Sequence, residues 1–251
     1  MIGWRGGAVF CGAVFCAAAL AVAALGSGCD TPAQPTSSAT ATAPASSTTP
    51  AAATASASAA VSAPPPTNVL LITIDSLRAD MPWQGYSRPI APHLTELAKQ
   101  SVVYPRAYAV SSYTAKSVGA LLSGRYPSTL WRGCTFFTEY APANVFFSEV
   151  LQQAGVRTLA GHAHKYFDKG KNLRQGFDVW RLTPGIRFNA TTDESITSPK
   201  LTALAIDMLS NPANTGKQFF AWLHYMDPHD QYKRHADVPD FGRKTRDYYD
   251  N

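Results

Sequence analysis

The chain has 251 residues and a formal net charge of +5, with 22 Lys and Arg against 17 Asp and Glu. The positive excess is small and scattered, and no stripe of Lys and Arg alternates with aromatic residues, so we expect no nucleic-acid partner. The composition changes sharply along the chain and predicts three parts: residues 1–29, residues 30–66 and one folded domain over residues 67–251.

Residues 1–29 have the pattern of an export signal. Arg5 supplies positive charge, an uncharged apolar run of about twenty residues follows, and small residues lead directly to Cys29. Small residues after an apolar core are typical of a cleavage site, and a Cys directly behind them favours lipid attachment, as in bacterial lipoproteins. We therefore expect an exported protein at the cell envelope, anchored through Cys29 on the periplasmic or extracellular side of a membrane. Secretory cleavage and an uncleaved anchor are the alternatives.

Residues 30–66 predict a disordered linker, because they are almost entirely Ala, Ser, Thr and Pro. Such a segment cannot bury enough apolar surface to offset the entropy that it would lose on ordering. Three consecutive prolines at 64–66 favour a semi-extended chain. The segment would hold the domain away from the membrane.

Hydrophobic patterns in residues 67–251 alternate between strands and helices. Strands are expected at Val69–Ile74, 156–160 and 219–223, with a further extended segment at 102–108. Helices are expected at 92–101, 114–122, 143–154 and 199–209, the last of them capped by Ser198. Such alternation predicts an α/β fold, a three-layer sandwich around a largely parallel central sheet.

Asp75 directly follows the apolar strand Val69–Ile74. The carboxyl ends of parallel strands are where α/β proteins build their sites, and an ionised carboxylate there needs a cation or hydrogen bonds. Asp75 is therefore a candidate metal ligand or catalytic group. A cap on the following turn is the alternative.

Thr114 stands at the start of a predicted helix, where backbone N–H groups and the helix dipole favour a bound anion such as phosphate or sulfate. A hydroxyl at that point can serve as a nucleophile if a cation or a base activates it. Lys116 and Ser117 are candidate oxyanion ligands in the same turn. A simple helix N-cap is the alternative role for Thr114.

His162 and His164 follow the predicted strand at 156–160, and alternation puts both rings on the same side. They are candidates for binding metal, contacting an oxyanion or carrying protons. Two surface histidines are the alternative.

His224, Asp227 and His229 follow the predicted strand at 219–223, and Pro228 forces a turn there. Three titratable residues so close to a strand end are typical of a site. A hydrogen-bonded turn is the alternative.

Four segments, in order along the chain, resemble the sulfatase family of the alkaline phosphatase superfamily. Residues 68–80 are similar to the family's first strand with its metal-binding Asp, and residues 121–127 to the stretch after its nucleophile motif. Residues 155–164 are similar to its Gly-Lys-Trp-His segment, and residues 224–232 to the His-x-x-Asp-Pro-His-x-x-Tyr segment of bacterial members. The resemblance implies an alkaline-phosphatase-like fold and a metal-dependent hydrolase of sulfate or phosphate esters.

The resemblance also assigns roles to residues. Counting back ten positions from Gly124 puts the family nucleophile at Thr114. Sulfatases convert a Cys or Ser at that position to formylglycine, and Thr cannot form that aldehyde, so Thr114 resembles the nucleophile of phosphoryl-transferring relatives. The divalent cation would be Ca²⁺ as in sulfatases, or Mn²⁺ or Zn²⁺ as in those relatives. Its expected ligands are Asp75, Ser76 and Thr114.

The remaining site residues act on the substrate. The expected catalytic partners of Thr114 are His162, His164 and His229, which would stabilise the transferring oxyanion. The expected substrate-binding residues are Lys116, Ser117, His224 and Asp227, of which His224 and Asp227 would orient His229.

The family's later half carries another metal-binding pair and a further Lys, which residues up to Asn251 do not include. We therefore expect a C-terminally truncated version of the fold, with an exposed sheet edge and few ligands for a cation. Three functions stay open: an exported hydrolase of sulfate or phosphate esters, a transferase that moves a phosphate-linked headgroup onto an envelope glycan or lipid, and an inactive sulfatase-like protein.

Overall fold

The structure is a computed structural model that describes residues 9–10, 67–135, 137–169, 172–187, 197–229 and 231–251. The expected lipidation site Cys29 and the expected linker therefore lie outside the described residues, as does most of the expected export signal. The described residues all belong to one compact unit, which contains Thr67–Asn251. None of their helices is long and apolar enough to cross a membrane.

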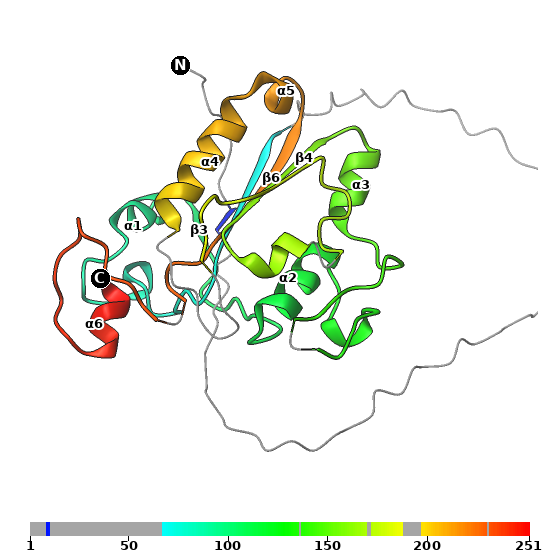
Figure 1. Ribbon diagram of the computed structural model, residues 1–251. Helices are drawn as coiled ribbons and strands as arrows, with labels where there is room; N and C mark the ends of the chain where they lie inside the picture. The colour runs from blue at the N-terminus through cyan, green and yellow to red at the C-terminus, as the bar shows by residue number, and fades with distance from the viewer. Residues whose placement is uncertain (1–8, 11–66, 136, 170–171, 188–196, 230) are drawn as a thin grey trace, which may run out of the picture. The chain divides into compact units, whose positions relative to one another are not determined.

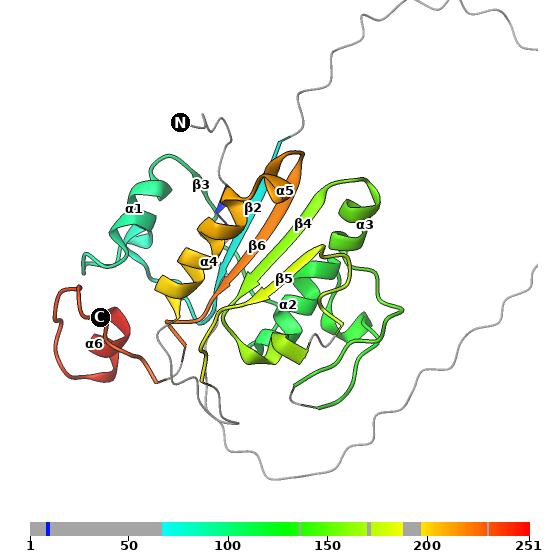
Figure 2. The same cartoon turned by 45° about the horizontal axis from the view of Figure 1, so that its top comes forward.

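A parallel four-stranded sheet is the centre of the domain (Figures 1 and 2). In spatial order its strands are β2 (Val69–Ile74), β6 (Phe219–Tyr225), β4 (Arg157–His162) and β5 (Val179–Leu182). β2 forms one edge of this sheet and is partly exposed, at 51% for Val69 and 42% for Ile72. The expected parallel sheet and its exposed edge are therefore both present in the described residues.

Helices cover both faces of the sheet (Figures 1 and 2), and they are α2 (Thr114–Ser123), α3 (Phe147–Gln153), α4 (Ser198–Ser210) and α5 (Pro212–Thr215). Side chains alternate along β6 and are buried on both of its faces. Phe219 and Ala221 pack in the core that includes α4, whereas Phe220 and Trp222 pack in the core that includes α2. The predicted three-layer sandwich is confirmed.

Shorter elements surround these layers. They are the 3₁₀ turns η1 (Pro82–Gln84), η2 (Pro127–Thr129) and η3 (Lys165–Lys169), the helices α1 (Pro92–Ala98) and α6 (Thr245–Asp250), and the strands β1 (Val9–Phe10) and β3 (Val102–Val103), which pair in parallel. Leu77, Met81 and Ile90 form a small third core under the segment that follows β2.

Several boundaries differ from the predicted ones. The helix expected at 143–154 begins only at Phe147. The Asn144 side chain accepts from the Trp131 N–H and donates to the Trp131 carbonyl, and these bonds hold the residues before Phe147 in a turn. Of the extended segment expected at 102–108, only β3 is a strand.

The strands β4 and β6 run further than expected and end at His162 and Tyr225. The site histidines His162 and His224 therefore lie inside strands and not after them. The strand β5 and the helix α5 were not predicted.

Candidate active site

The carboxylate at the end of β2 is the centre of the candidate site. Asp75 is 2% exposed, and the Thr114 hydroxyl donates a 2.6 Å hydrogen bond to its Oδ2 atom. The Ser76 hydroxyl reaches the Oδ1 atom at 3.3 Å. Burial alone raises the pKa of Asp75, but His224, the Thr114 hydroxyl and His229 outweigh burial and lower this pKa to about 2. The carboxylate is therefore ionised at neutral pH.

Thr114 is the first residue of α2, and the N-cap position belongs to Tyr113, which makes no side-chain cap bond. The Thr114 hydroxyl is directed at Asp75 across 39 positions of sequence. The simple N-cap role for Thr114 is therefore wrong. Because the ionised carboxylate accepts this hydrogen bond, it holds the Thr114 hydroxyl oxygen in one orientation at the N-terminus of α2.

Lys116 and Ser117 make their contacts with the loop before α2. The Ser117 hydroxyl donates to the Ser111 carbonyl at 2.7 Å, and the Lys116 ammonium lies 5.1 Å from the centre of the Tyr113 ring. Both predicted oxyanion ligands are thus engaged away from Asp75, and their roles on a substrate stay predictions.

His224 is the second group that faces Asp75. Its Nε2 atom lies 3.6 Å from Asp75 Oδ2, and its Nδ1 atom lies 2.8 Å from the Thr73 hydroxyl. The Thr73 hydroxyl also accepts a hydrogen bond from the Trp222 indole N–H at 3.0 Å. The Leu223 carbonyl lies 3.4 Å from the same hydroxyl oxygen. The contact with Thr73 holds the Nδ1 side of the ring against β2, and the Nε2 side faces the carboxylate.

Sequence reasoning missed Thr73 and Trp222. The available signal was periodicity, since Thr73 stands two residues before Asp75 on the same side of β2. Its partner His224 lies opposite it in the register of β2 and β6, which no local pattern shows.

His162 lies in the aromatic core. It is 0% exposed, its ring centre is 4.8 Å from that of Trp180 and 5.3 Å from that of Phe167, and neither ring nitrogen has a hydrogen-bond partner. Burial lowers the pKa of His162 to about 3, with help from His224 and His164. A neutral, enclosed ring does not fit the predicted role as an oxyanion ligand.

His164 lies nearer to the site. Its Nδ1 atom accepts from the Tyr166 N–H at 2.9 Å, so the neutral ring carries its proton on Nε2. Burial lowers the pKa of His164 to about 4, and His224 and His229 act in the same direction while Asp75 opposes them. His164 and His229 therefore belong to the same electrostatic cluster as Asp75.

Asp227 caps a helix. Its carboxylate accepts from the Thr197 N–H at 2.8 Å, from the Thr197 hydroxyl at 2.6 Å and from the Ser198 N–H at 3.0 Å, and it lies 3.2 Å from His235 Nε2. These contacts hold the N-terminus of α4. Thr197 is the N-cap residue, which corrects the expectation that Ser198 caps the helix. The expectation that Asp227 orients His229 stays a prediction. The predicted turn at Pro228 is present, because the His229 N–H donates to the Met226 carbonyl.

A cation site is incomplete in the part of the chain that the structure describes. No group of three or more His, Cys, Asp or Glu side chains in that part is arranged to hold a metal ion. Asp75, Ser76 and Thr114 offer one carboxylate and two hydroxyls, whereas hard cations take about six oxygen ligands, some of them water. The expected ligands are adjacent, but they do not form a tight site.

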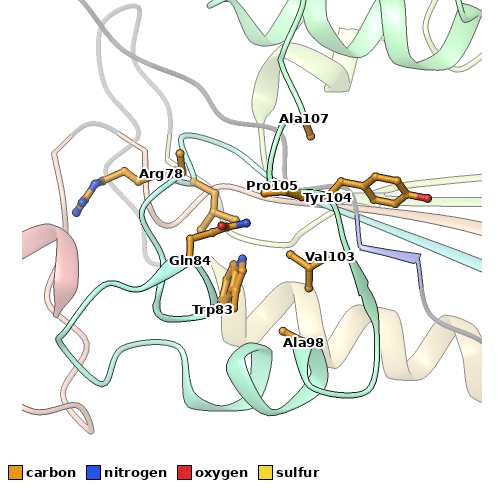
Figure 3. Close-up of a pocket in the computed structure, with 10 residues that line it drawn as sticks. Arg78, Trp83, Gln84, Ala98, Val103, Tyr104, Pro105 and Ala107 are labelled. Atoms are coloured by element: carbon orange, nitrogen blue, oxygen red, sulfur yellow. The ribbon is translucent and has the colours of Figure 1, made fainter.

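A pocket lies beside the segment that follows Asp75 and Ser76, and Leu77, Arg78 and Ala79 form part of its lining (Figure 3). It has about 510 Å³ of empty space, part of it open to solvent, and its lining includes Trp83, Gln84, Val103, Tyr104 and Pro105. Asp75, Thr114 and the site histidines are not in its lining. The pocket therefore borders the turn after Asp75 but does not include the candidate residues.

Comparisons with known proteins agree with this architecture. A family model described as Sulfatase matches residues 67–251. An ulvan-active sulfatase of Formosa agariphila is 34% identical over 101 residues, which cover 35% of this chain and 17% of that protein. A second ulvan-active sulfatase of this bacterium is 30% identical over 127 residues, 47% of this chain and 24% of that protein. The chain thus spans less than a quarter of the length of either relative.

Solved structures share the fold. A protein of the alkaline phosphatase superfamily from Vibrio parahaemolyticus has a TM-score of 0.55 at 16% identity, over 73% of this chain and 47% of that one. A Bacteroides fragilis protein described as a sulfatase has a TM-score of 0.54 at 20% identity, over 74% of this chain and 55% of that one. The predicted alkaline-phosphatase-like fold is confirmed.

Proposed function

Because this chain belongs to the sulfatase family, whose model matches residues 67–251, we propose that it is a hydrolase of sulfate or phosphate esters with Thr114 as its nucleophile. The observation that carries this proposal is the 2.6 Å hydrogen bond from the Thr114 hydroxyl to the ionised Asp75 carboxylate. It joins a strand end to a helix N-terminus, two places where anionic substrates are bound and attacked.

Binding comes first. The anionic group of the ester would lie against the N-terminus of α2, where backbone N–H groups and the helix dipole favour negative charge. His164 would donate its Nε2 proton to a non-bridging oxygen, and His229 would do the same from the loop after β6. Lys116 would have to leave the Tyr113 ring in order to reach the same group.

The attack then forms a bond between Thr114 Oγ1 and phosphorus or sulfur, while the bond from that atom to the alcohol oxygen breaks. Asp75 keeps the hydroxyl in line by accepting its hydrogen bond until the proton leaves. With a pKa of about 2, Asp75 does not retain that proton, which passes to the departing alcohol oxygen. Water then cleaves the Thr114 ester and restores the hydroxyl.

A divalent cation would neutralise the ester and make the Thr114 hydroxyl more acidic. Ca²⁺, Mn²⁺ and Zn²⁺ are the candidates, and Asp75, Ser76 and Thr114 would supply the first ligands. Further ligands would have to come from solvent or from polypeptide outside the described residues.

The substrate class follows from two considerations. Two relatives are ulvan-active sulfatases, which makes ulvan the first polymer to test. A Thr nucleophile cannot become formylglycine, and this favours phosphate esters or the transfer of a phosphate-linked headgroup to a glycan or lipid.

Export and anchoring complete the proposal. The small-residue run before Cys29 supports a lipoprotein at the cell envelope, with residues 30–66 as the linker and residues 67–251 as the domain. A Cys29→Ser variant that still fractionates with membranes would refute lipid anchoring.

The test uses the full chain with aryl sulfate and aryl phosphate esters, each with added Ca²⁺, Mn²⁺ or Zn²⁺. Thr114→Val keeps the side-chain shape and removes the hydroxyl, so we expect a loss of at least about 1000-fold in kcat. Thr114→Ser is the matched control, because it keeps the hydroxyl, and should retain measurable turnover. Turnover by the Val variant at the wild-type rate would show that Thr114 is not the nucleophile.

Product analysis separates the rival functions. A hydrolase releases free sulfate or phosphate, whereas a transferase yields a new phosphate ester on the acceptor. A folded chain without turnover under all of these conditions would favour the inactive alternative.

A further inference from the structure

We propose that Tyr249 of α6 is a positioning residue that holds the Ser76 backbone in the conformation that directs Asp75 towards Thr114. The inference deepens the proposed function, and it rests on that function only for the roles of Asp75 and Thr114.

Ser76 has an unusual backbone. Its φ angle is 56°, in the left-handed region that disfavours residues with a Cβ atom. Because Ser76 directly follows Asp75, this conformation determines how the chain leaves β2 and where the carboxylate is presented. A strained residue at such a point persists only if the surrounding structure holds it there.

The Tyr249 hydroxyl provides that hold. It donates to the Ser76 carbonyl at 3.0 Å and accepts from the Arg78 N–H at 2.9 Å, and these partners are 173 and 171 positions away in sequence. One hydroxyl thus bridges the two ends of the tight turn after Asp75. Burial raises the pKa of Tyr249 to about 12, so the hydroxyl stays protonated and can donate.

The Tyr249 ring is held from two sides. The Arg78 guanidinium lies 5.1 Å from the ring centre. Tyr232 meets the ring edge-on at 5.2 Å. Tyr232 comes from the same loop as His229, so Tyr249 contacts the segments that follow both β2 and β6.

Ion pairs anchor α6 itself. Arg88 binds Asp247 at 2.7 Å and Asp250 at 2.8 Å, and the Tyr86 hydroxyl donates to the same Asp250 carboxylate. Figures 1 and 2 both show α6 on the side of the sheet where α1 lies, away from α2 and α3. These contacts fix the ring without its hydroxyl, so the hydroxyl can be removed separately from the anchor.

The test compares Tyr249→Phe with Tyr248→Phe in the full chain, by hydrogen exchange and mass spectrometry. Tyr248 is the matched control, because it is the neighbouring Tyr and is 37% exposed. One hydrogen bond of ordinary net strength corresponds to about a fivefold change in local opening. We therefore expect about fivefold faster exchange in peptides over residues 76–80 of Tyr249→Phe, with peptides from β4 and β6 unchanged and no change in Tyr248→Phe.

A second variant tests the route through Ser76. Ser76→Gly removes the Cβ that makes the left-handed conformation unfavourable. In that background Tyr249→Phe should accelerate exchange over residues 76–80 by less than about twofold, because less strain remains to be held. An equally large acceleration in both backgrounds would overturn the inference, and so would unchanged or uniformly faster exchange in Tyr249→Phe alone.

Turnover supplies the second readout. Tyr249→Phe should lower kcat and leave KM unchanged, since the substrate still meets the N-terminus of α2 while Asp75 is less well aligned with Thr114. If Tyr249→Phe loses protection over residues 76–80 but the wild-type chain shows no turnover, the inference is supported and the proposed function is refuted. Normal protection over residues 76–80 would overturn the inference, whatever the turnover.

Discussion

Replacing His162 by Phe should make the protein more resistant to acid. The ring is 0% exposed and has no hydrogen-bond partner, and its pKa is lowered from 6.5 to about 3. Between these values the unfolded chain binds a proton that the folded chain does not. The stability that comes from keeping His162 neutral is therefore complete above pH 6.5 and is lost progressively as the pH falls towards 3.

The magnitude follows from linkage. From pH 6.5 to pH 5 the loss is 1.5 pH units at about 1.36 kcal/mol each, or about 2 kcal/mol. The Phe variant lacks this loss, so its advantage over wild type should grow by about 2 kcal/mol between pH 7 and pH 5. His164, whose pKa is lowered to about 4, contributes a parallel loss in both proteins and cancels in the comparison.

Urea unfolding of the full chain at pH 7 and pH 5 measures the effect. His93→Phe is the control, because it makes the same substitution at an exposed histidine. If wild type and His162→Phe lose the same stability between the two pH values, within about 0.5 kcal/mol, then the folded protein protonates His162 and the ring is not enclosed as described.

Three further changes test other contacts. Thr73→Val should lower kcat without a change in the cooperativity of unfolding, because the Thr73 hydroxyl orients His224. Thr73→Ser keeps the hydroxyl and should keep a higher kcat than Thr73→Val. Equal activity of both variants would contradict that role. Asp227→Ala should lower the free energy of unfolding by about 1–2 kcal/mol in urea, because it removes the acceptor at the N-terminus of α4; an unchanged unfolding midpoint would rule out the cap. Gly119→Ala should destabilise the protein by more than about 2 kcal/mol in urea, because a Cβ there overlaps the Tyr140 ring. Gly133→Ala is the control, because the nearest atom to its Cβ would be 3.7 Å away, and it should change the stability by less than about 0.5 kcal/mol. Equal effects of the two glycine changes would refute the packing of Tyr140 on α2.

Local signals predicted the parts of the site that local sequence determines. The apolar run that ends at Asp75 predicted both the strand and the place of this carboxylate at its carboxyl end. Helical spacing with a stop at Gly124 predicted α2, and the observed helix ends there with φ at 65°. Each of these features depends on neighbours within a few residues, which periodicity captures.

Features that depend on distant contacts escaped prediction. His162 and His224 were expected after strands, because a histidine interrupts an apolar run, yet the aromatic core accommodates both rings inside the sheet. The contacts of Asp227 with the N-terminus of α4 were not expected either, because Thr197 lies 30 positions before it in sequence. Tyr249 offered no signal, because its partners lie more than 170 positions away.

The pairing of β2 with β6 also constrains the order of folding. Backbone pairing at this edge joins residues about 150 positions apart, as for the Asp75 N–H and the Tyr225 carbonyl. At about 5–20 residues per second, β2 leaves the ribosome roughly 8–30 s before β6 exists. During that interval an apolar strand has no partner in the sheet, and a chaperone would have to keep it from aggregating. The segment that carries Asp75 is therefore among the first parts of the domain to be synthesised and among the last to be secured.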